Sequence, residues 1–256
     1  KQTPQDRTEH TAMTPQLTEL WVYLSASPLL GLTLTLMAYQ AAFWLYRRTG
    51  FHPLANPVML AIAMLATVLW LGDIDYRSYF DGAQFVHFLL GPATVALAIP
   101  LYTQWPRLKT MAGPLVIALV LGSLTAVLSA YAIGAMLGAS HASLMSLAPK
   151  SVTTPIAMAV AEPLGGLPAL AAALVMLTGV IGAVGAPYLY RWLRIGDHAI
   201  RGFAIGLAAH GIGTARAFQI SEQAGAFAAL AMGLNGLLTA LSLPWIMPWV
   251  ERLLGR

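Results

Sequence analysis

The sequence predicts an all-α polytopic membrane protein with about seven transmembrane helices, one re-entrant or broken segment and an inverted repeat. Of its 256 residues, 58% are hydrophobic and only 9% are charged, whereas a soluble domain carries about 25% charged residues. Six windows without Asp, Glu, Lys or Arg are each longer than the ~20 apolar residues that a helix needs to cross a bilayer. These windows are 20–46, 49–72, 82–106, 110–149, 163–190 and 223–250.

This composition excludes several classes of protein. A chain with so few charges cannot cover the surface of a soluble enzyme with solvated side chains. The net charge of +4 is too small to indicate nucleic-acid binding, and the absence of cysteine excludes disulfides, thiolate metal sites and cysteine nucleophiles. The histidines lack the spacing of a metal site, and no catalytic signature is present, so we expect neither an enzyme nor a bound metal.

The chain divides into a tail and one membrane domain. Residues 1–16 are polar and contain two prolines, which predicts a flexible N-terminal tail before a transmembrane domain at 17–256. We predict membrane helices at about 20–46, 54–72, 82–103, 111–138, 168–193, 199–220 and 225–250.

Residues 149–166 do not fit this series. They contain Pro149, Pro155, Pro163, Gly165 and Gly166, and proline breaks helices and frees backbone polar groups. Irregular backbone at membrane depth is tolerated where it is buried in protein or lines a water-filled cavity. We therefore predict a re-entrant or half-spanning segment here.

The distribution of basic residues predicts the orientation, because cytoplasmic loops carry the excess of Lys and Arg. With the N-terminus outside, nine basic residues share one side of the predicted topology and three share the other. The nine are Arg47, Arg48, Arg107, Lys109, Arg191, Arg194, Arg201, Arg252 and Arg256. We therefore predict a multi-pass protein with its C-terminus in the cytoplasm.

Short internal similarities indicate an inverted repeat. Residues 91–94 (Gly-Pro-Ala-Thr) resemble 211–214 (Gly-Ile-Gly-Thr), and 122–126 resemble 236–240. The predicted topology runs the members of each pair in opposite directions, which is typical of transporters whose site lies near the midplane at the repeat interface.

The first polar cluster within the apolar sequence lies at 149–155. Lys150 stands beside the hydroxyls of Ser151, Thr153 and Thr154, and Pro155 follows. If a half-helix begins near Pro155, its free amides and its dipole, together with the ammonium group, form a site for a carboxylate or phosphate. The alternative is that Lys150 reaches the lipid headgroups and the hydroxyls only cap a short helix.

The second cluster lies at 210–216. His210, Gly211, Gly213, Thr214 and Arg216 combine a side chain able to carry a proton, two glycines that permit close backbone approach, and a guanidinium able to bind a carboxylate. The alternative is that the glycines pack against a neighbouring helix, Arg216 reaches the interface and His210 bonds a backbone carbonyl. Asn56 and Thr94 are weaker candidates at helix breaks, since small-residue packing explains their surroundings almost as well.

These residues carry a family resemblance. Lys150 to Ala157 with Gly165 and Gly166 resembles the signature of the LrgB/CidB/YohK membrane family. So does the series Arg201-Gly202, Gly206, His210, Gly213 to Arg216, Glu222 and Gly225-Ala226, and so does the stretch from Pro92 to Tyr102. The resemblance covers about residues 20–250. One departure is Ala224, where many relatives have an acidic residue.

The resemblance implies two functions of different classes. One is a carrier of small carboxylates of the glycolate, glycerate, pyruvate or lactate type, as in the related plastid glycolate/glycerate translocator. No cofactor is expected, and the coupling of transport to a proton or cation is left open. The other is a holin/antiholin-like regulator of murein hydrolase export and autolysis. Cations beside broken helices suit reversible binding of a small anion, so the carrier is favoured. The implied location is the bacterial cytoplasmic (inner) membrane. The implied partners are the lipid bilayer, an LrgA/CidA-like small membrane protein and the carboxylate; a homo-oligomer is left open.

Overall fold

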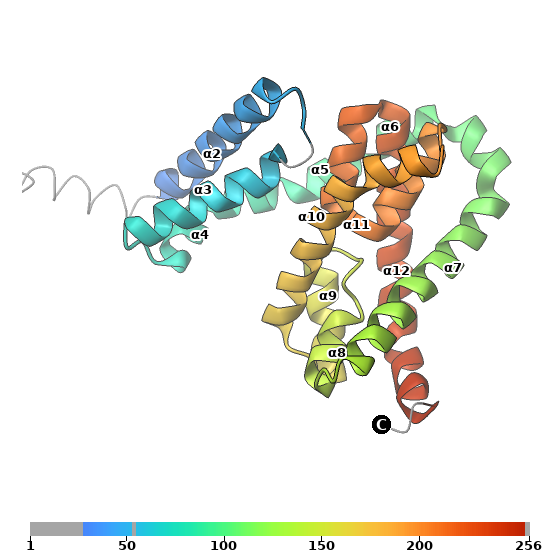
Figure 1. Cartoon of the computed structure of the whole chain (residues 1–256). Helices are drawn as coiled ribbons and strands as arrows, with labels where there is room; N and C mark the ends of the chain where they lie inside the picture. Colours follow the sequence, from blue (N-terminus) through green and yellow to red (C-terminus); the bar gives the residue numbers. More distant parts are fainter. Residues whose placement is uncertain (1–27, 53–54, 254–256) are drawn as a thin grey trace, which may run out of the picture. The chain divides into compact units, whose positions relative to one another are not determined.

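A computed structural model describes residues 28–52 and 55–253, and within these ranges every regular element is a helix (Figure 1). The helices are α2 (Pro28–Arg48), α3 (Pro57–Leu71), α4 (Tyr76–Phe88), α5 (Leu90–Ala96), α6 (Ala98–Thr103), α7 (Trp105–Met136), α8 (His141–Leu147), α9 (Thr154–Ala161), η2 (Glu162–Leu164), α10 (Pro168–Trp192), α11 (His198–Ile220) and α12 (Glu222–Leu253). The predicted all-helical class is confirmed. The predicted tail at 1–16 lies outside the described residues.

Five helical segments of the described chain are long and apolar enough to cross a membrane. They are Leu29–Arg48, Tyr76–Thr103, Trp105–Met136, Pro168–Trp192 and Glu222–Arg252. The span expected at 54–72 corresponds to α3, which has 15 residues and is therefore only about 22 Å long. The predicted count of about seven stays a prediction.

The chain divides into two compact units, Lys1–Pro92 and Ala93–Arg256. In the first unit, α2 packs against α3 and α4. Gly31 permits a close approach to α4, because a Cβ atom there would lie 2.3 Å from the carbonyl oxygen of Tyr79. The hydroxyls of Thr35 and Tyr79 are also hydrogen-bonded at 2.8 Å. The single domain predicted over 17–256 stays a prediction, and the rest of the fold concerns the second unit.

In the second unit, α7 and α12 run side by side in the same direction. Near their starts, Leu115 and Leu119 pack in one cluster with Phe227 and Ala231. Towards their ends, residues Val127 and Tyr131 of α7 pack in another cluster with Leu243 and Met247 of α12. α10 runs the opposite way, since its first turns pack against α9 and its last turn packs against the start of α12. These three helices form the frame of the unit (Figure 1).

The predicted irregular segment is a short helical hairpin made of α8, a loop and α9. Its two ends meet, because a Cβ atom on Gly165 would lie 3.3 Å from the His141 ring. The Ser146 hydroxyl in the last turn of α8 also accepts a hydrogen bond from the Leu167 backbone N–H at 2.8 Å. His141 at the start of α8 also pairs with Glu251 near the end of α12 at 2.8 Å. Neither arm, of seven and eight residues, is long enough to span a bilayer. The expected break is therefore confirmed, and the start of α9 at Thr154 agrees with the half-helix predicted near Pro155.

The helix expected at about 199–220 is present as α11, but it does not form one continuous span, because it folds back on itself. The backbone leaves the helical conformation at Ala209 and His210. Gly202 and Gly206 of the first arm (198–208) pack on Ala224 and Ala228, so this arm runs parallel to α12. Gly213 of the second arm (211–220) packs on Ile205, so the arms are antiparallel. Each arm is roughly 15 Å long, about half the hydrocarbon core.

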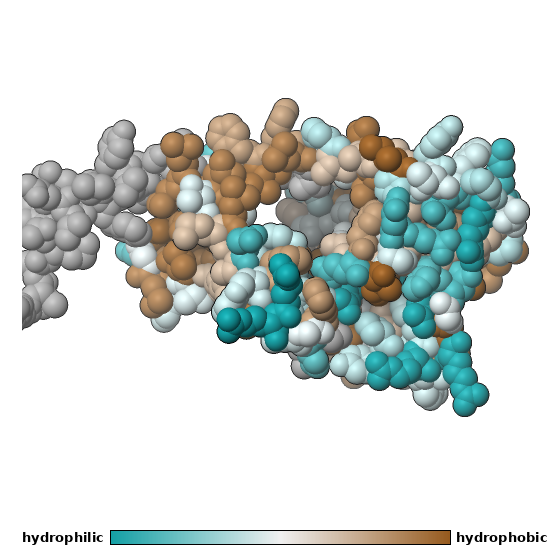
Figure 2. All heavy atoms as spheres, turned by 90° about the horizontal axis from the view of Figure 1, so that it is seen from above, coloured by the Kyte–Doolittle hydropathy of each residue, from teal (hydrophilic) through white to brown (hydrophobic). Residues whose placement is uncertain are grey.

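Both ends of α11 lie at the same end of the bundle, beside the start of α7. Asp197, before the first arm, forms an ion pair with Arg107, and Gln223, after the second arm, donates to Gln104 at 3.0 Å. Figure 2 shows hydrophilic side chains gathered over this end of the unit. The α8–α9 hairpin begins at the other end of α12, so the two hairpins enter the bundle from opposite ends.

This geometry corrects two expectations. Residues 122–126 and 236–240 were expected to run in opposite directions, but they lie on α7 and α12, which run in the same direction. The unit instead contains two helix-then-hairpin segments of opposite orientation, α7 with α8–α9 and α10 with α11. The predicted inverted repeat itself stays a prediction.

The second correction concerns charge. Arg252 lies at the end of α12 that contacts α8, opposite to Arg107. The nine basic residues therefore do not all lie at one end of the bundle, and the cytoplasmic C-terminus stays a prediction.

Candidate functional site

The tips of the two hairpins meet at Asn235, halfway along α12. The Asn235 amide nitrogen donates to the carbonyl oxygen of Ser151 at 3.2 Å and to that of Leu207 at 3.1 Å. Ser151 lies in the loop between α8 and α9, and Leu207 lies just before the break in α11. Asn235 follows Gln223 by about 18 Å and precedes Glu251 by about 24 Å along the helix. One side chain thus ties together two polar clusters that are distant in the sequence.

The first tip places the predicted residues at the N-terminus of α9. The Lys150 ammonium donates to the Ser151 hydroxyl at 3.3 Å, and Lys150 is half-buried. Thr153 is the N-cap residue, but its side chain makes no capping hydrogen bond, and Pro155 occupies the first turn. The amides of this first turn are therefore not used by the cap. Ile156, in the first turn of α9, packs against Gly236, the residue after Asn235.

The second tip is formed by His210, Gly211, Gly213 and Thr214. His210 has φ 41° and ψ −132°, a conformation that costs a non-glycine residue about 1–3 kcal/mol. Its ring nitrogen Nε2 lies 2.9 Å from the carbonyl oxygen of Val175 on α10. The Thr214 hydroxyl donates to the His210 carbonyl at 2.8 Å, at the start of the second arm. The ring contact matches the alternative in which His210 bonds a backbone carbonyl.

Glycines of α10 and α11 make room for this tip. A Cβ atom on Gly179 would lie 2.7 Å from the His210 ring, and one on Gly182 would lie 2.5 Å from the Ala209 side chain. In the hairpin itself, a Cβ on Gly213 would lie 2.6 Å from the Ile205 carbonyl oxygen. Gly211 is different, because the nearest atom to its Cβ would be the Met232 sulfur at 3.9 Å. The close packing of the two arms therefore explains why residue 213 is a glycine. Gly211, by contrast, has open space beside α12.

Arg216 does not lie at the tip. It is six residues beyond His210 on the second arm, about 9 Å along the helix, and its guanidinium donates to the Gln219 side chain at 3.1 Å. It is nearer to the end of α11 than to the Asn235 contact, in line with the alternative that it reaches the interface.

The two weaker candidates belong to other helices than the two hairpins. Asn56 belongs to the first unit, where its side-chain oxygen accepts from the backbone N–H groups of Val58 at 2.9 Å and Met59 at 3.3 Å and so caps α3. Thr94 is an exposed residue of α5. A ligand-binding role for either residue stays a prediction.

Asn235 was missed by the sequence analysis, although a signal for it exists. It is the only Asn, Gln or charged residue between positions 224 and 250. A side chain of such polarity inside an apolar span is a functional candidate by default. Its burial supports this, since only 1% of the residue is exposed.

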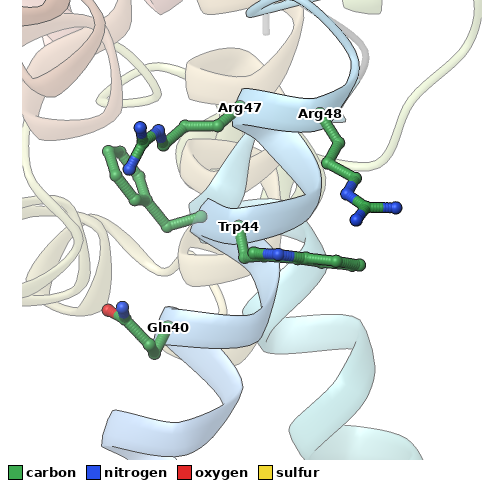
Figure 3. A pocket seen from close by; sticks show the side chains of 5 residues that line it. Gln40, Trp44, Arg47 and Arg48 are labelled. Atoms are coloured by element: carbon green, nitrogen blue, oxygen red, sulfur yellow. The ribbon is translucent and has the colours of Figure 1, made fainter.

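Two hollows are found away from the hairpin tips. One of about 390 Å³ is lined by Gln40, Phe43, Trp44, Arg47 and Arg48, all on α2 (Figure 3). Arg48 lies over the Trp44 ring at 4.5 Å, an arrangement typical of a membrane–water interface. The other, of about 330 Å³, is lined only by apolar residues of α7 and α11, so it offers no group for an anion. Within the described residues, no cluster of three His, Asp or Glu could hold a metal.

A model of the LrgB-like family matches residues 35–249, a range that includes both hairpins and Asn235. The chain belongs to the LrgB-like family. It is 36% identical over 222 residues to the uncharacterized protein YwbG of Bacillus subtilis, covering 87% of this chain and 98% of the relative. It is 31% identical over 225 residues to the antiholin-like protein LrgB of Bacillus mycoides, covering 88% of this chain and 97% of that relative. No solved structure matches the chain significantly.

Family membership and the apolar helices together establish a multi-pass bacterial membrane protein. The resemblance drawn from the sequence motifs is thereby confirmed.

Proposed function

We propose that this LrgB-like protein is a carrier of small carboxylates, which bind where the two hairpin tips meet. The observation that carries the proposal is the contact of Asn235 with both tips. Hairpins entering from opposite ends of the bundle give two thin barriers on either side of one central point. A carrier needs such an arrangement, because one barrier must open while the other stays closed.

The chemistry at the tips favours an anion. The N-terminus of α9 offers amides not engaged by its cap residue, and the second arm of α11 begins a new helix at Gly211. Helix N-termini attract anions through free N–H groups and the helix dipole. Lys150 supplies the positive charge beside them. We therefore assign carboxylate binding to Lys150, Ser151, Thr153, Thr154 and Pro155 on one tip and to His210, Gly211, Gly213 and Thr214 on the other.

A second candidate function is supported by the names of the relatives. Several are called antiholin-like protein LrgB, and these names favour a regulator of murein hydrolase export and autolysis over a carrier. A protein with that function controls a nonselective lesion in the membrane and acts with an LrgA-like partner. The buried polar contact at the centre of α12 is what favours the carrier.

The orientation follows from the positive-inside rule applied to the second unit. Arg107, Lys109, Arg191, Arg194 and Arg201 lie at the end of the bundle where α7 begins, whereas Arg252 lies at the other end. We place the first end in the cytoplasm of a bacterial inner membrane. The end of α12 then faces outside, opposite to the expectation from the sequence alone.

Counterflow in liposomes distinguishes the two functions. Purified protein, with and without an LrgA-like partner, is reconstituted into vesicles loaded with unlabelled lactate, and entry of labelled lactate is followed beside release of a trapped dye. A carrier gives saturable counterflow and retains the dye. Dye release without counterflow contradicts the carrier and supports the antiholin-like regulator.

A further inference from the structure

The side-chain oxygen of Asn235 is a buried hydrogen-bond acceptor without a partner among the described residues. The orientation of the amide is fixed, because its nitrogen faces two carbonyl oxygens, at 3.1 and 3.2 Å, which can only accept. A flipped amide would place its oxygen against those carbonyls. The unpaired oxygen is therefore a feature of the site itself and does not depend on how the amide is turned.

An unpaired acceptor in this position needs a hydrogen-bond donor. Leaving a buried polar atom without a hydrogen bond is unfavourable, and at 1% exposure Asn235 has no bulk water to compensate. Two nearby donors are engaged elsewhere. The Thr214 hydroxyl donates to the His210 carbonyl, and Lys150 donates to Ser151.

The surroundings place this acceptor beside the proposed anion site. Ile156 in the first turn of α9 packs on Gly236, which follows Asn235 directly. The Thr214 hydroxyl lies 3.8 Å from the sulfur of Met232, one turn before Asn235. The N-termini of α9 and of the second arm of α11 thus both adjoin the part of α12 that carries the unpaired oxygen.

We propose that Asn235 is the specificity-determining residue of the carrier and selects 2-hydroxy acids over 2-oxo acids. This inference rests on the proposed carrier function. A carboxylate held by Lys150 and the helix N-termini would place its C2 substituent next to α12. A C2 hydroxyl can donate to the Asn235 side-chain oxygen, whereas a C2 carbonyl oxygen can only accept and would face another acceptor.

The test uses three probes of similar size: lactate, with a C2 hydroxyl, pyruvate, with a C2 carbonyl, and propionate, with neither. Each competes with labelled lactate for counterflow in vesicles containing the full chain. We expect lactate to compete about tenfold to a hundredfold better than pyruvate or propionate, the range set by one unsatisfied buried acceptor. Equal competition by all three overturns the assignment and leaves the carrier in place. No counterflow with any probe overturns the carrier and this assignment with it.

Two variants locate the effect. Asn235→Leu keeps a side chain of similar size but removes the acceptor. It should reduce the preference for lactate over pyruvate to less than about threefold, a residual preference smaller than one hydrogen bond provides. The matched control is Leu237→Asn on the exposed side of α12, which should keep the wild-type preference. A preference unchanged in Asn235→Leu contradicts the proposal. If that variant does not fold, the ranking of the three probes in the wild-type protein still decides.

Discussion

Asn235 and Ser151 are 84 positions apart in the sequence, yet the Asn235 amide donates to the Ser151 carbonyl at 3.2 Å. The same amide donates to the Leu207 carbonyl, so one residue of α12 holds the tips of both hairpins together. In the proposed carrier, opening either side of the site requires breaking one of these hydrogen bonds. Each contributes about 0.5–1.5 kcal/mol, which is small enough for the tips to separate during a transport cycle.

The ammonium of Lys150 should contribute more to anion binding than the guanidinium of Arg216. Lys150→Gln should weaken carboxylate binding by roughly tenfold to over a hundredfold, because it removes a charged hydrogen bond worth about 1.5–3 kcal/mol. Arg216→Gln should change affinity only slightly, since Arg216 bonds Gln219 away from the tips. Titration calorimetry with lactate measures both, and Lys150→Arg, which keeps the charge, is the control. Equal losses in Lys150→Gln and Arg216→Gln would place both residues in the site.

Gly213 and Gly211 form a matched pair for testing the fold of α11. Gly213→Ala should lower the free energy of unfolding by about 1–3 kcal/mol, because its Cβ would press on the Ile205 carbonyl at 2.6 Å. Gly211→Ala has open space and should be neutral or slightly stabilising. Unfolding in a denaturing detergent series measures the difference. If α11 were a straight helix, the two substitutions would have similar effects.

The pH dependence of stability should reveal the Asp197–Arg107 pair at the base of the second hairpin. Hydrogen bonds from the backbone N–H groups of Ile200 and Ala199, together with Arg107, hold the pKa of Asp197 below its ordinary value. A lowered pKa means that this stabilisation is present above the unfolded pKa of about 3.9 and is lost as the pH falls through the folded pKa. Asp197→Asn should therefore be less stable than wild type at neutral pH.

Melting temperatures of the two proteins from pH 7 downwards test this expectation. The curves should converge at acidic pH, where the wild-type carboxylate is protonated. A gap that stays constant to low pH would show that the carboxylate does not stabilise the fold.

The two ends of the bundle should be accessible from opposite sides of the membrane. A cysteine at Gly196 should react with a membrane-impermeant thiol reagent only after the cells are opened, and a cysteine at Ser140 should react in intact cells. Both positions are exposed, and the natural chain has no cysteine. A reporter at the C-terminus should read outside, together with Ser140. Labelling of both cysteines from one side would contradict the bundle geometry.

The sequence predicts where a helix of this fold is interrupted better than it predicts how the interrupted segments pack. Pro155 correctly marks the start of α9, because proline is favoured in the first turn of a helix and disfavoured beyond it. The reversal at His210 has no such marker. It depends on Gly179, Gly182 and Gly213, which admit the tip and the second arm, and such packing between distant segments is invisible in local periodicity.

The positions of charges show the same limit. A single span at 199–220 groups Arg252 with Arg107, whereas the reversal in α11 puts these two residues at opposite ends of the bundle. Asn235 could have been found from its isolation in an apolar window, but its two partners could not, because they are backbone carbonyls of residues 84 and 28 positions away.

In the proposed carrier, the site between the tips opens alternately to the two sides of the membrane. The most direct measurement is labelling of Thr154→Cys, at the start of α9, by an impermeant thiol reagent applied first from outside and then from inside. The account predicts that this cysteine reacts from both sides and that lactate slows both reactions. Reaction from one side only, at a rate that lactate does not change, would contradict it.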